Sequence, residues 1–213
     1  MTDQWTLAAT SSTGVMGLAV GRVSADEVEE SQVIEIFTDR RHAEEISPRL
    51  QELLATAGIV IGDLERLVID VGPGRFTGLR VGLATVRALG FALDIPVIGL
   101  TSLAVLAASA DDPNPSQDHV VTAVIDARRN EVFQQTFAGN TPVSDAVVGK
   151  PEDLASVIGG GVVVGDGLDR YLEFYQAAAA HNGATPVLDR HPRAGVMLGM
   201  SRGLPGKPGT EVQ

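Results

Sequence analysis

The sequence contains no cysteine, which excludes disulfide bonds, thiolate zinc sites and cysteine nucleophiles. Aromatic residues are also scarce, at 4% of the 213 residues, whereas hydrophobic residues as a whole reach 44%. The core is therefore expected to consist of small and branched aliphatic side chains, which suit helices packed closely against strands. A chain of this length is expected to form one large domain or two small ones.

Basic side chains are in short supply as well. The 16 Lys and Arg residues face 27 Asp and Glu residues, which gives a formal net charge of −11. Because affinity for nucleic acids comes mainly from basic side chains that neutralise phosphates, RNA is expected to be bound only indirectly, through a more basic partner. No basic region precedes an apolar run at the N-terminus, and no apolar segment approaches the roughly 20 residues of a membrane span. We therefore expect a cytoplasmic protein without membrane contact.

The order of apolar runs and turn residues is typical of an α/β protein. Strands are predicted at residues 5–9, 15–20, 31–38, 67–71, 96–100, 120–126, 131–139 and 162–165. Helices are predicted at residues 40–58, 77–93, 102–110, 151–158, 168–181 and 192–203. The first three strands are expected to form an antiparallel meander, and Pro48 is expected to kink or restart the first helix.

The second half of the chain repeats the first in outline, with hairpin strands followed by an α/β segment. The polar stretch 111–119 contains two prolines and predicts a boundary between domains 1–110 and 111–213. Residues 204–213 are expected to form a loose tail.

One stretch, DVGPGRFTGLRVG at residues 70–82, follows a predicted strand and leads into a predicted helix. Gly72, Gly74 and Gly78 give G-x-G-x-x-x-G, which matches neither the dinucleotide fingerprint nor a P-loop. A glycine turn at a helix N-terminus, here with Thr77, is nevertheless a generic anion site. The alternative is structural, with glycines that permit a tight backbone and Thr77 as the helix cap. The spacing alone favours the structural role.

The helix after this loop is unusually apolar. Ala84, Ala88 and Ala92 share one i, i+4 row, and Gly78 and Gly82 share another. A helix this apolar is expected to be buried on more than one side, and rows of small residues let a second helix approach closely. The neighbour is either the helix near residues 41–57 or another protein, and burial entirely within this chain remains equally open.

Other catalytic constellations are weaker. The sequence has no H-E-x-x-H and no G-x-S-x-G, which argues against a zinc protease and a serine hydrolase. Asp126 and Glu131 are interpreted as the ends of two hairpin strands. The four histidines are interpreted as structural or surface residues, with no metal site: His42, His119, His181 and His191. The Gly165–Gly167 turn mirrors the first glycine loop.

The segment GPGRFTGLRVGLATVRALGFALDIPVIGLTSL, residues 72–103, resembles the signature of the bacterial tRNA threonylcarbamoyladenosine biosynthesis family TsaB, also called YeaZ. HAEEISPRLQELLATAG is similar to the first helix of that family, and VIDARRNEVF is similar to its I-D-A-R-x-x-E-V-Y segment. Arg75 takes the usual serine position, and Thr10 stands where the family usually carries aspartate. These similarities run in family order over about residues 5–175.

The resemblance implies an α/β protein of the actin-like ATPase (ribonuclease H-like) fold, with two related subdomains, mixed sheets flanked by helices and a shortened second subdomain. It implies a non-catalytic scaffold that activates the homologous transferase TsaD, which forms the threonylcarbamoyl group on the tRNA adenosine 3′ of the anticodon. The ATPase TsaE joins them, and the chain alone is expected to form a homodimer. No cofactor is expected to be required, although ATP or ADP is compatible with the complex interface. Thr10 weakens the case for a metal–phosphate site, because a hydroxyl is a poorer ligand than a carboxylate for a hard cation.

The expected partner interface lies on the two helices that flank the loop. Its residues are Ile46, Leu50, Leu54, Arg80, Val81, Thr85, Ala88 and Ala92. An independent ATPase that uses the Gly72–Gly78 loop and the Gly165–Gly167 turn is the alternative, and it would bind phosphate at Gly72, Gly74, Thr77 and Gly78. A regulatory homodimer through the same helix face is a third hypothesis.

Overall fold

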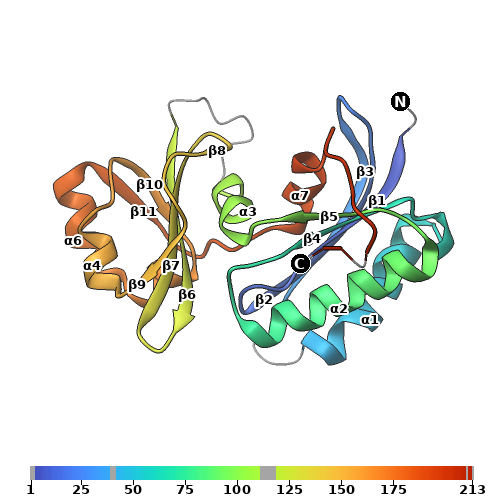
Figure 1. Ribbon diagram of the computed structural model, residues 1–213, viewed down its shortest axis with the longest axis horizontal. Helices are drawn as coiled ribbons and strands as arrows, with labels where there is room; N and C mark the ends of the chain where they lie inside the picture. Colours follow the sequence, from blue (N-terminus) through green and yellow to red (C-terminus); the bar gives the residue numbers. More distant parts are fainter. Residues whose placement is uncertain (1–2, 39–41, 111–118, 210, 213) are drawn as a thin grey trace. The chain divides into compact units, whose positions relative to one another are not determined.

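The computed structural model describes residues 3–38, 42–110, 119–209 and 211–212, and the chain divides into two compact units (Figure 1). Unit 1 comprises Met1–Gly72, Phe76–Thr101 and Arg193–Gln213. Unit 2 comprises Pro73–Arg75 and Ser102–Pro192. Each unit is built around its own sheet.

The sheet of unit 1 has the strand order β3-β2-β1-β4-β5. Its strands are β1 (Gln4–Thr10), β2 (Val15–Val23), β3 (Val28–Phe37), β4 (Arg66–Asp70) and β5 (Val97–Leu100). The first three strands are antiparallel, which confirms the predicted meander, and β4 and β5 then join β1 in parallel. The parallel strands bring the ends of β1 and β4 to one edge of the sheet.

Two long helices, α1 (His42–Ala57) and α2 (Phe76–Leu93), run side by side along one face of this sheet, and the short helix α7 (Ala194–Met200) covers the other (Figure 1). A single 3₁₀ turn, η1 (Ile61–Asp63), follows α1. Apolar residues of α1 recur at helical spacing and fill the core with Leu67 and Ile69 of β4. The helix runs unbroken through Pro48, so the predicted restart does not occur. The predicted start at residues 40–41 lies outside the described residues.

Unit 2 repeats this connectivity. Its sheet has the order β11-β10-β6-β7-β8, and β9 also pairs with β7. Its strands are β6 (Val120–Arg128), β7 (Glu131–Ala138), β8 (Thr141–Pro142), β9 (Val147–Gly149), β10 (Gly161–Val164) and β11 (Ala184–Val187). The β6–β7 hairpin is antiparallel, while β10 and β11 follow β6 in parallel, as β4 and β5 follow β1.

Alternate residues of β6 build two separate cores in unit 2. Ala123 and Ile125 pack with α3 (Ser102–Ala108), whereas Val124 packs on the opposite face with Leu168 and Tyr175. The helices on that opposite face are α4 (Pro151–Ala155), α5 (Asp166–Arg170) and α6 (Leu172–Asn182). The single helix predicted at residues 168–181 is therefore two helices that meet at Tyr171, and the short strands β8, β9 and β11 were not predicted.

The limits of the two units differ from the predicted ranges 1–110 and 111–213 in three places, the first of which is the short segment Pro73–Arg75 in unit 2. Helix α3 belongs to unit 2, because Leu103 and Leu106 pack against the sheet of that unit. The C-terminal segment Arg193–Gln213 returns to unit 1, where α7 packs on β1, β2 and β3. Residues 111–118 of the predicted linker lie outside the described residues.

The end of the chain is not the loose tail that the sequence predicts. Residues 204–209 and 211–212 are called here the C-terminal strap, and Lys207 of the strap pairs with the free edge of β5. The Val97 N–H donates to the Lys207 carbonyl at 2.8 Å, and the Lys207 N–H donates back at 2.9 Å. The Arg87 guanidinium of α2 donates to the Gly209 carbonyl at 3.0 Å, and Val212 is buried in the core. Backbone pairing at a sheet edge explains why glycine and proline content alone misled the prediction.

Candidate functional site

A buried carboxylate joins the ends of β1 and β4. Asp70 is fully buried and accepts a hydrogen bond from the Thr10 hydroxyl at 2.8 Å. It also accepts from the backbone N–H groups of Ser11 at 3.1 Å and Ser12 at 3.3 Å. Three neutral donors therefore hold the charge, and they tie the β1–β2 turn to the strand that leads into the glycine loop.

The first turns of α2 pack directly against that same β1–β2 turn. A Cβ atom on Gly78 would lie 2.1 Å from the Ser11 carbonyl oxygen, and one on Gly82 would lie 2.2 Å from the Ser11 hydroxyl. Only glycine permits this approach. The side of α2 that carries Gly78 and Gly82 is thus packed directly against the chain's own β1–β2 turn, so these two glycines have a packing role.

The backbone conformation of the loop explains some of its residues. Gly72 adopts φ +104°, which an L side chain rarely tolerates, as the chain leaves β4. Helix α2 begins at Phe76, so Thr77 lies within the first helical turn, where it is exposed, and not at the predicted cap position. Gly74 belongs with the short segment Pro73–Arg75 that is assigned to unit 2. A phosphate site at these residues stays an untested hypothesis.

Helix α2 has two sharply different faces. Its buried residues follow one i, i+4 row toward the sheet: Gly78, Gly82, Val86 and Gly90. Its exposed residues are Phe76, Thr77, Arg80, Ala84, Ala88, Phe91 and Ala92. Phe76 is 67% exposed and Phe91 is 76% exposed, and the Arg80 guanidinium lies 3.9 Å from the centre of the Phe76 ring. We call this exposed set the α2 face. It is largely apolar, has a single charged residue, Arg80, and is not covered by the parts of the chain that the structure describes.

The structure separates the predicted interface residues into two groups. Arg80, Ala88 and Ala92 lie on the α2 face, with Val81 and Thr85 half-buried at its edges. On α1, by contrast, Ile46, Leu50 and Leu54 are only 4%, 7% and 6% exposed, because they face the core of unit 1. Those three residues support α1 from beneath and are not a surface for a partner. Sequence reasoning also missed Phe76 and Phe91, since exposed phenylalanines have no pattern that distinguishes them from core residues.

The apolar character of α2 has a second consequence. With 18 residues, it is long and apolar enough to cross a membrane by length and composition alone, although core helices of soluble proteins meet the same criteria. The expectation that no segment reaches this threshold is therefore wrong. The packing of its glycine row against Ser11, Ile69 of β4 and Val97 of β5 accounts for one side of the helix, and the α2 face remains to be explained.

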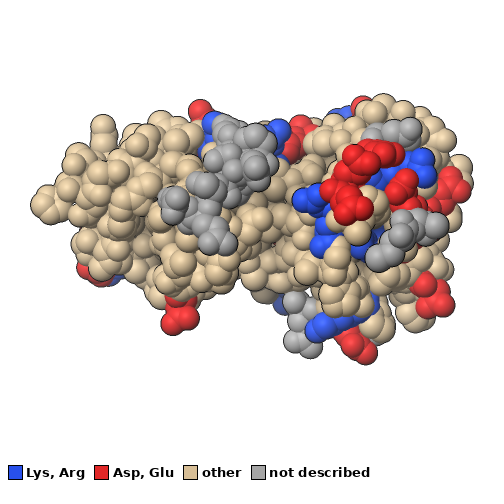
Figure 2. All heavy atoms as spheres, turned by 90° about the horizontal axis from the view of Figure 1, so that it is seen from above, with Lys and Arg blue, Asp and Glu red and all other residues tan. Residues whose placement is uncertain are grey.

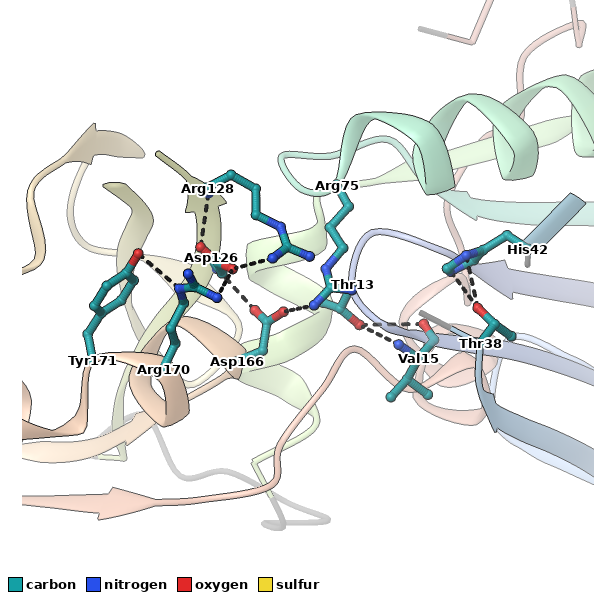
Figure 3. Close-up of polar contacts among 10 residues, drawn as sticks. All are labelled: Thr13, Val15, Thr38, His42, Arg75, Asp126, Arg128, Asp166, Arg170 and Tyr171. Atoms are coloured by element: carbon teal, nitrogen blue, oxygen red, sulfur yellow. Dashed lines mark hydrogen bonds and ion pairs between the residues drawn. The ribbon is translucent and has the colours of Figure 1, made fainter. Parts of the chain in front are cut away.

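Unit 2 carries a charged cluster at the corresponding strand ends. Asp126 near the end of β6 is nearly buried, and its backbone N–H donates to Asp166 at 3.0 Å. Arg128 and Arg170 reach the same Asp126 oxygen at 3.5 and 3.8 Å, and Arg75 lies 3.7 Å from Asp166 (Figure 3). Burial raises the pKa of the Asp166 carboxyl above 3.8, opposed by the Asp126 N–H and the Arg75 charge. Glu131 begins β7 as predicted, but β6 does not end at Asp126: it continues to Arg128, which pairs with Glu131, while Asp126 pairs with Val132.

No group of three or more metal-ligating side chains is found among the described residues. His42, at the start of α1, is buried and its ring bonds to the Thr38 hydroxyl at 2.9 Å, as Figure 3 shows. The glycines of the Gly165–Gly167 turn permit close approach to β6, since a Cβ on Gly165 would lie 2.1 Å from the Val124 carbonyl oxygen. Their arrangement accounts for the turn without a ligand.

Comparison with known proteins identifies the relatives of this chain. The sequence model of one family, described as TsaD, tRNA N6-adenosine threonylcarbamoyltransferase, matches residues 28–163. The tRNA threonylcarbamoyladenosine biosynthesis protein TsaB of Haemophilus influenzae is 37% identical over 97 residues, which cover 46% of this chain and 40% of that protein. TsaB of Escherichia coli is 36% identical over 94 residues, which cover 44% and 40%. The aligned part therefore spans less than half of the curated relatives.

A solved structure, YeaZ from Pseudomonas aeruginosa, superposes over 98% of this chain and 97% of its own with a TM-score of 0.79 and 26% identity. The two mixed sheets, each flanked by helices, are those of the actin-like fold, which confirms the predicted fold class. The chain belongs to the family that the TsaD sequence model describes, and within it to the TsaB (YeaZ) proteins.

Proposed function

We propose that this chain is a non-catalytic subunit in the formation of threonylcarbamoyladenosine on tRNA, and that it binds and activates a homologous TsaD-type transferase through the α2 face. The observation that carries the proposal is that face itself. It combines a row of alanines with two phenylalanines that are more than two-thirds exposed, on a helix whose other side is anchored to the sheet. Contiguous apolar surface of this kind marks interaction sites.

Sequence similarity to the transferase family supports a TsaD-type transferase as the partner. The names of the TsaB relatives refer to threonylcarbamoyladenosine biosynthesis on tRNA, and the matching sequence model is that of the transferase. Two homologous proteins carry equivalent helices, and equivalent helices with small-residue rows can pack closely. A TsaE-type ATPase as a third component stays a prediction from the resemblance.

The charge distribution supports only indirect contact with tRNA. The net charge is −11. On the face drawn in Figure 2, Lys and Arg are interspersed with Asp and Glu over unit 1, and the drawn face of unit 2 is mostly uncharged. No continuous basic stripe is visible on this face, and the net charge is negative, so the partner is expected to hold the tRNA.

The non-catalytic role is supported by what surrounds Asp70. Its carboxylate is occupied by Thr10 and by two backbone donors, and Ser11 fills the space against Gly78. An independent ATPase would need a carboxylate and a phosphate cradle that are open to ligand. ATP or ADP at the interface of a complex remains a separate prediction.

The experiment is to mix the chain with the TsaD-type protein of its own organism and to measure mass by size-exclusion chromatography with light scattering. Ala88→Glu is expected to abolish the complex, because it places an unpaired charge at the centre of the α2 face, while the melting temperature stays unchanged since Ala88 is exposed. Val157→Glu is the matched control, because Val157 is 71% exposed in unit 2. Absence of a complex with the unaltered chain, or a complex that survives Ala88→Glu, would contradict the proposal.

A further inference from the structure

Strand β3 forms one edge of the sheet of unit 1, because in the described part of the chain it pairs with β2 alone. It is 10 residues long, Val28–Phe37. A β-bulge between Val20 and Arg22 of β2 interrupts the ladder opposite the N-terminal half of β3. From Gln32 to Phe37, by contrast, the two strands pair without interruption. The C-terminal half of β3 therefore presents a regular edge.

The register with β2 fixes which backbone groups of β3 face outward. The Thr38 N–H donates to the Gly14 carbonyl at 3.1 Å, and the same register continues back along the strand. In an antiparallel pair, residues with and without hydrogen bonds to the neighbouring strand alternate. Val33 and Phe37 are therefore among the residues whose N–H and C=O groups point away from β2. Such groups are a template for another extended chain.

The side chains along this edge are two exposed apolar residues with an acidic residue between them. Val33 is 46% exposed and Phe37 is 76% exposed, and Glu35 lies between them on the same face of the sheet. That face also carries α7, since Arg193 lies 3.7 Å from Glu35 and a Cβ on Gly195 would lie 3.2 Å from Val33. Lys and Pro, which commonly protect edge strands, are absent from β3. The edge is thus open to pairing.

The charge of β3 argues against a second copy of the chain as the occupant. The strand contains three glutamates and no basic residue. Two β3 edges paired antiparallel about Glu35 would place their carboxylates directly opposite each other, which destabilises a strand pair. The net charge of −11 adds repulsion between whole chains. A basic residue opposite Glu35 is instead attracted, in addition to the ion pair with Arg193.

We propose that the C-terminal half of β3 binds an extended segment of another protein as an additional strand, and that this segment carries a basic residue between two apolar residues at alternate positions. The outward backbone groups of Val33 and Phe37 bond to the segment, and the side chains of Val33, Glu35 and Phe37 select its sequence. The site is separate from the α2 face, because α1 packs on β2 and β3 whereas α2 packs on β1, β4 and β5. The inference therefore goes beyond the proposed function and does not depend on it.

The probe is a cyclised β-hairpin peptide with one strand that reads Thr-Val-Thr-Lys-Thr-Val-Thr, because a preorganised strand loses less entropy on binding. Calorimetric titration measures its affinity for the chain. A hairpin with Glu in place of Lys is expected to bind at least about tenfold more weakly, because it meets Glu35. Phe37→Lys is expected to weaken the Lys hairpin by a similar factor. Val60→Lys is the matched control and should change nothing, since Val60 is 66% exposed elsewhere in unit 1.

Amide exchange at single residues, measured by NMR, locates the bound hairpin. We expect the Lys hairpin to slow exchange at Val33 and Phe37 more than at Ile34 and Ile36, whose N–H groups already bond to β2. No binding of the Lys hairpin, equal binding of the Glu hairpin, or protection confined to α2 would overturn the proposal. Protection of Val33 and Phe37 that grows with the concentration of the chain alone would also overturn it, because a second copy would then occupy the edge. Failure to bind the transferase would contradict the proposed function and leave these measurements unaffected.

Discussion

Units 1 and 2 share one topology but differ in how they neutralise the buried carboxylates at the ends of two parallel strands. The strand pair β1 and β4 corresponds to β6 and β10, and in both units polar side chains meet where these strands end. Unit 1 places a hydroxyl, Thr10, against a carboxylate, Asp70. Unit 2 places two carboxylates there, Asp126 and Asp166, and surrounds them with three arginines.

The two units differ in the number of buried carboxylates at these strand ends, and the side chains around the carboxylates differ accordingly. The buried Asp70 carboxylate accepts from a hydroxyl and two backbone N–H groups, whereas the two carboxylates of unit 2 repel each other and lie near three arginine side chains. In unit 1 a hydroxyl, Thr10, stands where the family resemblance predicts a carboxylate, so the two side chains attract each other. The β1–β2 turn packs on Gly78 and Gly82 and holds α2 against the sheet, with its outer face exposed.

The largest change in stability is expected when unit 1 is given a second carboxylate at its strand ends, as unit 2 has. Thr10→Asp places a second carboxylate next to the buried Asp70 carboxylate, and the repulsion should reduce the free energy of unfolding at pH 7 by about 3–5 kcal/mol. Because repulsion raises the pKa of one carboxyl of such a pair, stability should recover as the pH falls. Urea unfolding of Thr10→Asp and of the control Thr10→Val, expected to lose about 1–2 kcal/mol, would measure this. Equal losses in both variants would contradict the account.

A smaller loss of stability is expected when an alanine replaces a glycine that packs closely against the backbone, and the loss should differ between the two units. In unit 1, Gly78→Ala drives a Cβ against the Ser11 backbone oxygen and should cost about 1–3 kcal/mol. In unit 2, the Cβ of Gly167→Ala would lie 2.8 Å from a Val124 methyl group and 3.0 Å from the Ile125 backbone, a less severe overlap that should cost less. Thermal unfolding of both, with Gly159→Ala as the control because nothing lies within 4 Å of it, ranks the three. A loss at Gly78 no greater than at Gly159 would show that the turn does not pack on α2.

The ionisation of Asp166 predicts a pH dependence of the free energy of unfolding that originates in unit 2. Burial raises its folded pKa above 3.8, so the folded state binds more protons than the unfolded state between these two values. Stability should therefore fall as the pH rises through 3.8 toward the folded pKa, and this component should vanish in Asp166→Asn. Chemical unfolding from pH 3 to pH 7 measures it, with exposed Asp145→Asn as the control. An unchanged profile in Asp166→Asn would sink this assignment.

The smallest change in stability is expected for the Ser12 hydroxyl, which lies close to the Asp70 network. The Ser12 hydroxyl is buried and has no hydrogen-bond partner among the described residues, while its N–H serves Asp70. Ser12→Ala keeps that N–H and should change the free energy of unfolding by less than about 0.5 kcal/mol. A loss comparable to that of Thr10→Val would mean that the hydroxyl contributes to the network.

Much of this could be predicted from the sequence, and the failures have physical causes. Periodicity located the main strands and helices, and the specific loop motif indicated the family. The buried state of Ile46, Leu50 and Leu54 could not be predicted, because an apolar row looks the same whether it faces a core or a partner. The partnership of Thr10 with Asp70 depends on parallel pairing of strands 60 residues apart. The strap depends on two backbone hydrogen bonds to β5, which leave no pattern in side chains.

Hydrogen–deuterium exchange of the chain, alone and saturated with its TsaD-type partner, tests the central claim most directly. The account predicts that the partner slows exchange in α2, residues 76–93, and leaves α6, residues 172–182 of unit 2, unchanged. Slower exchange confined to unit 2, or no change in α2 when the complex is fully formed, would contradict it.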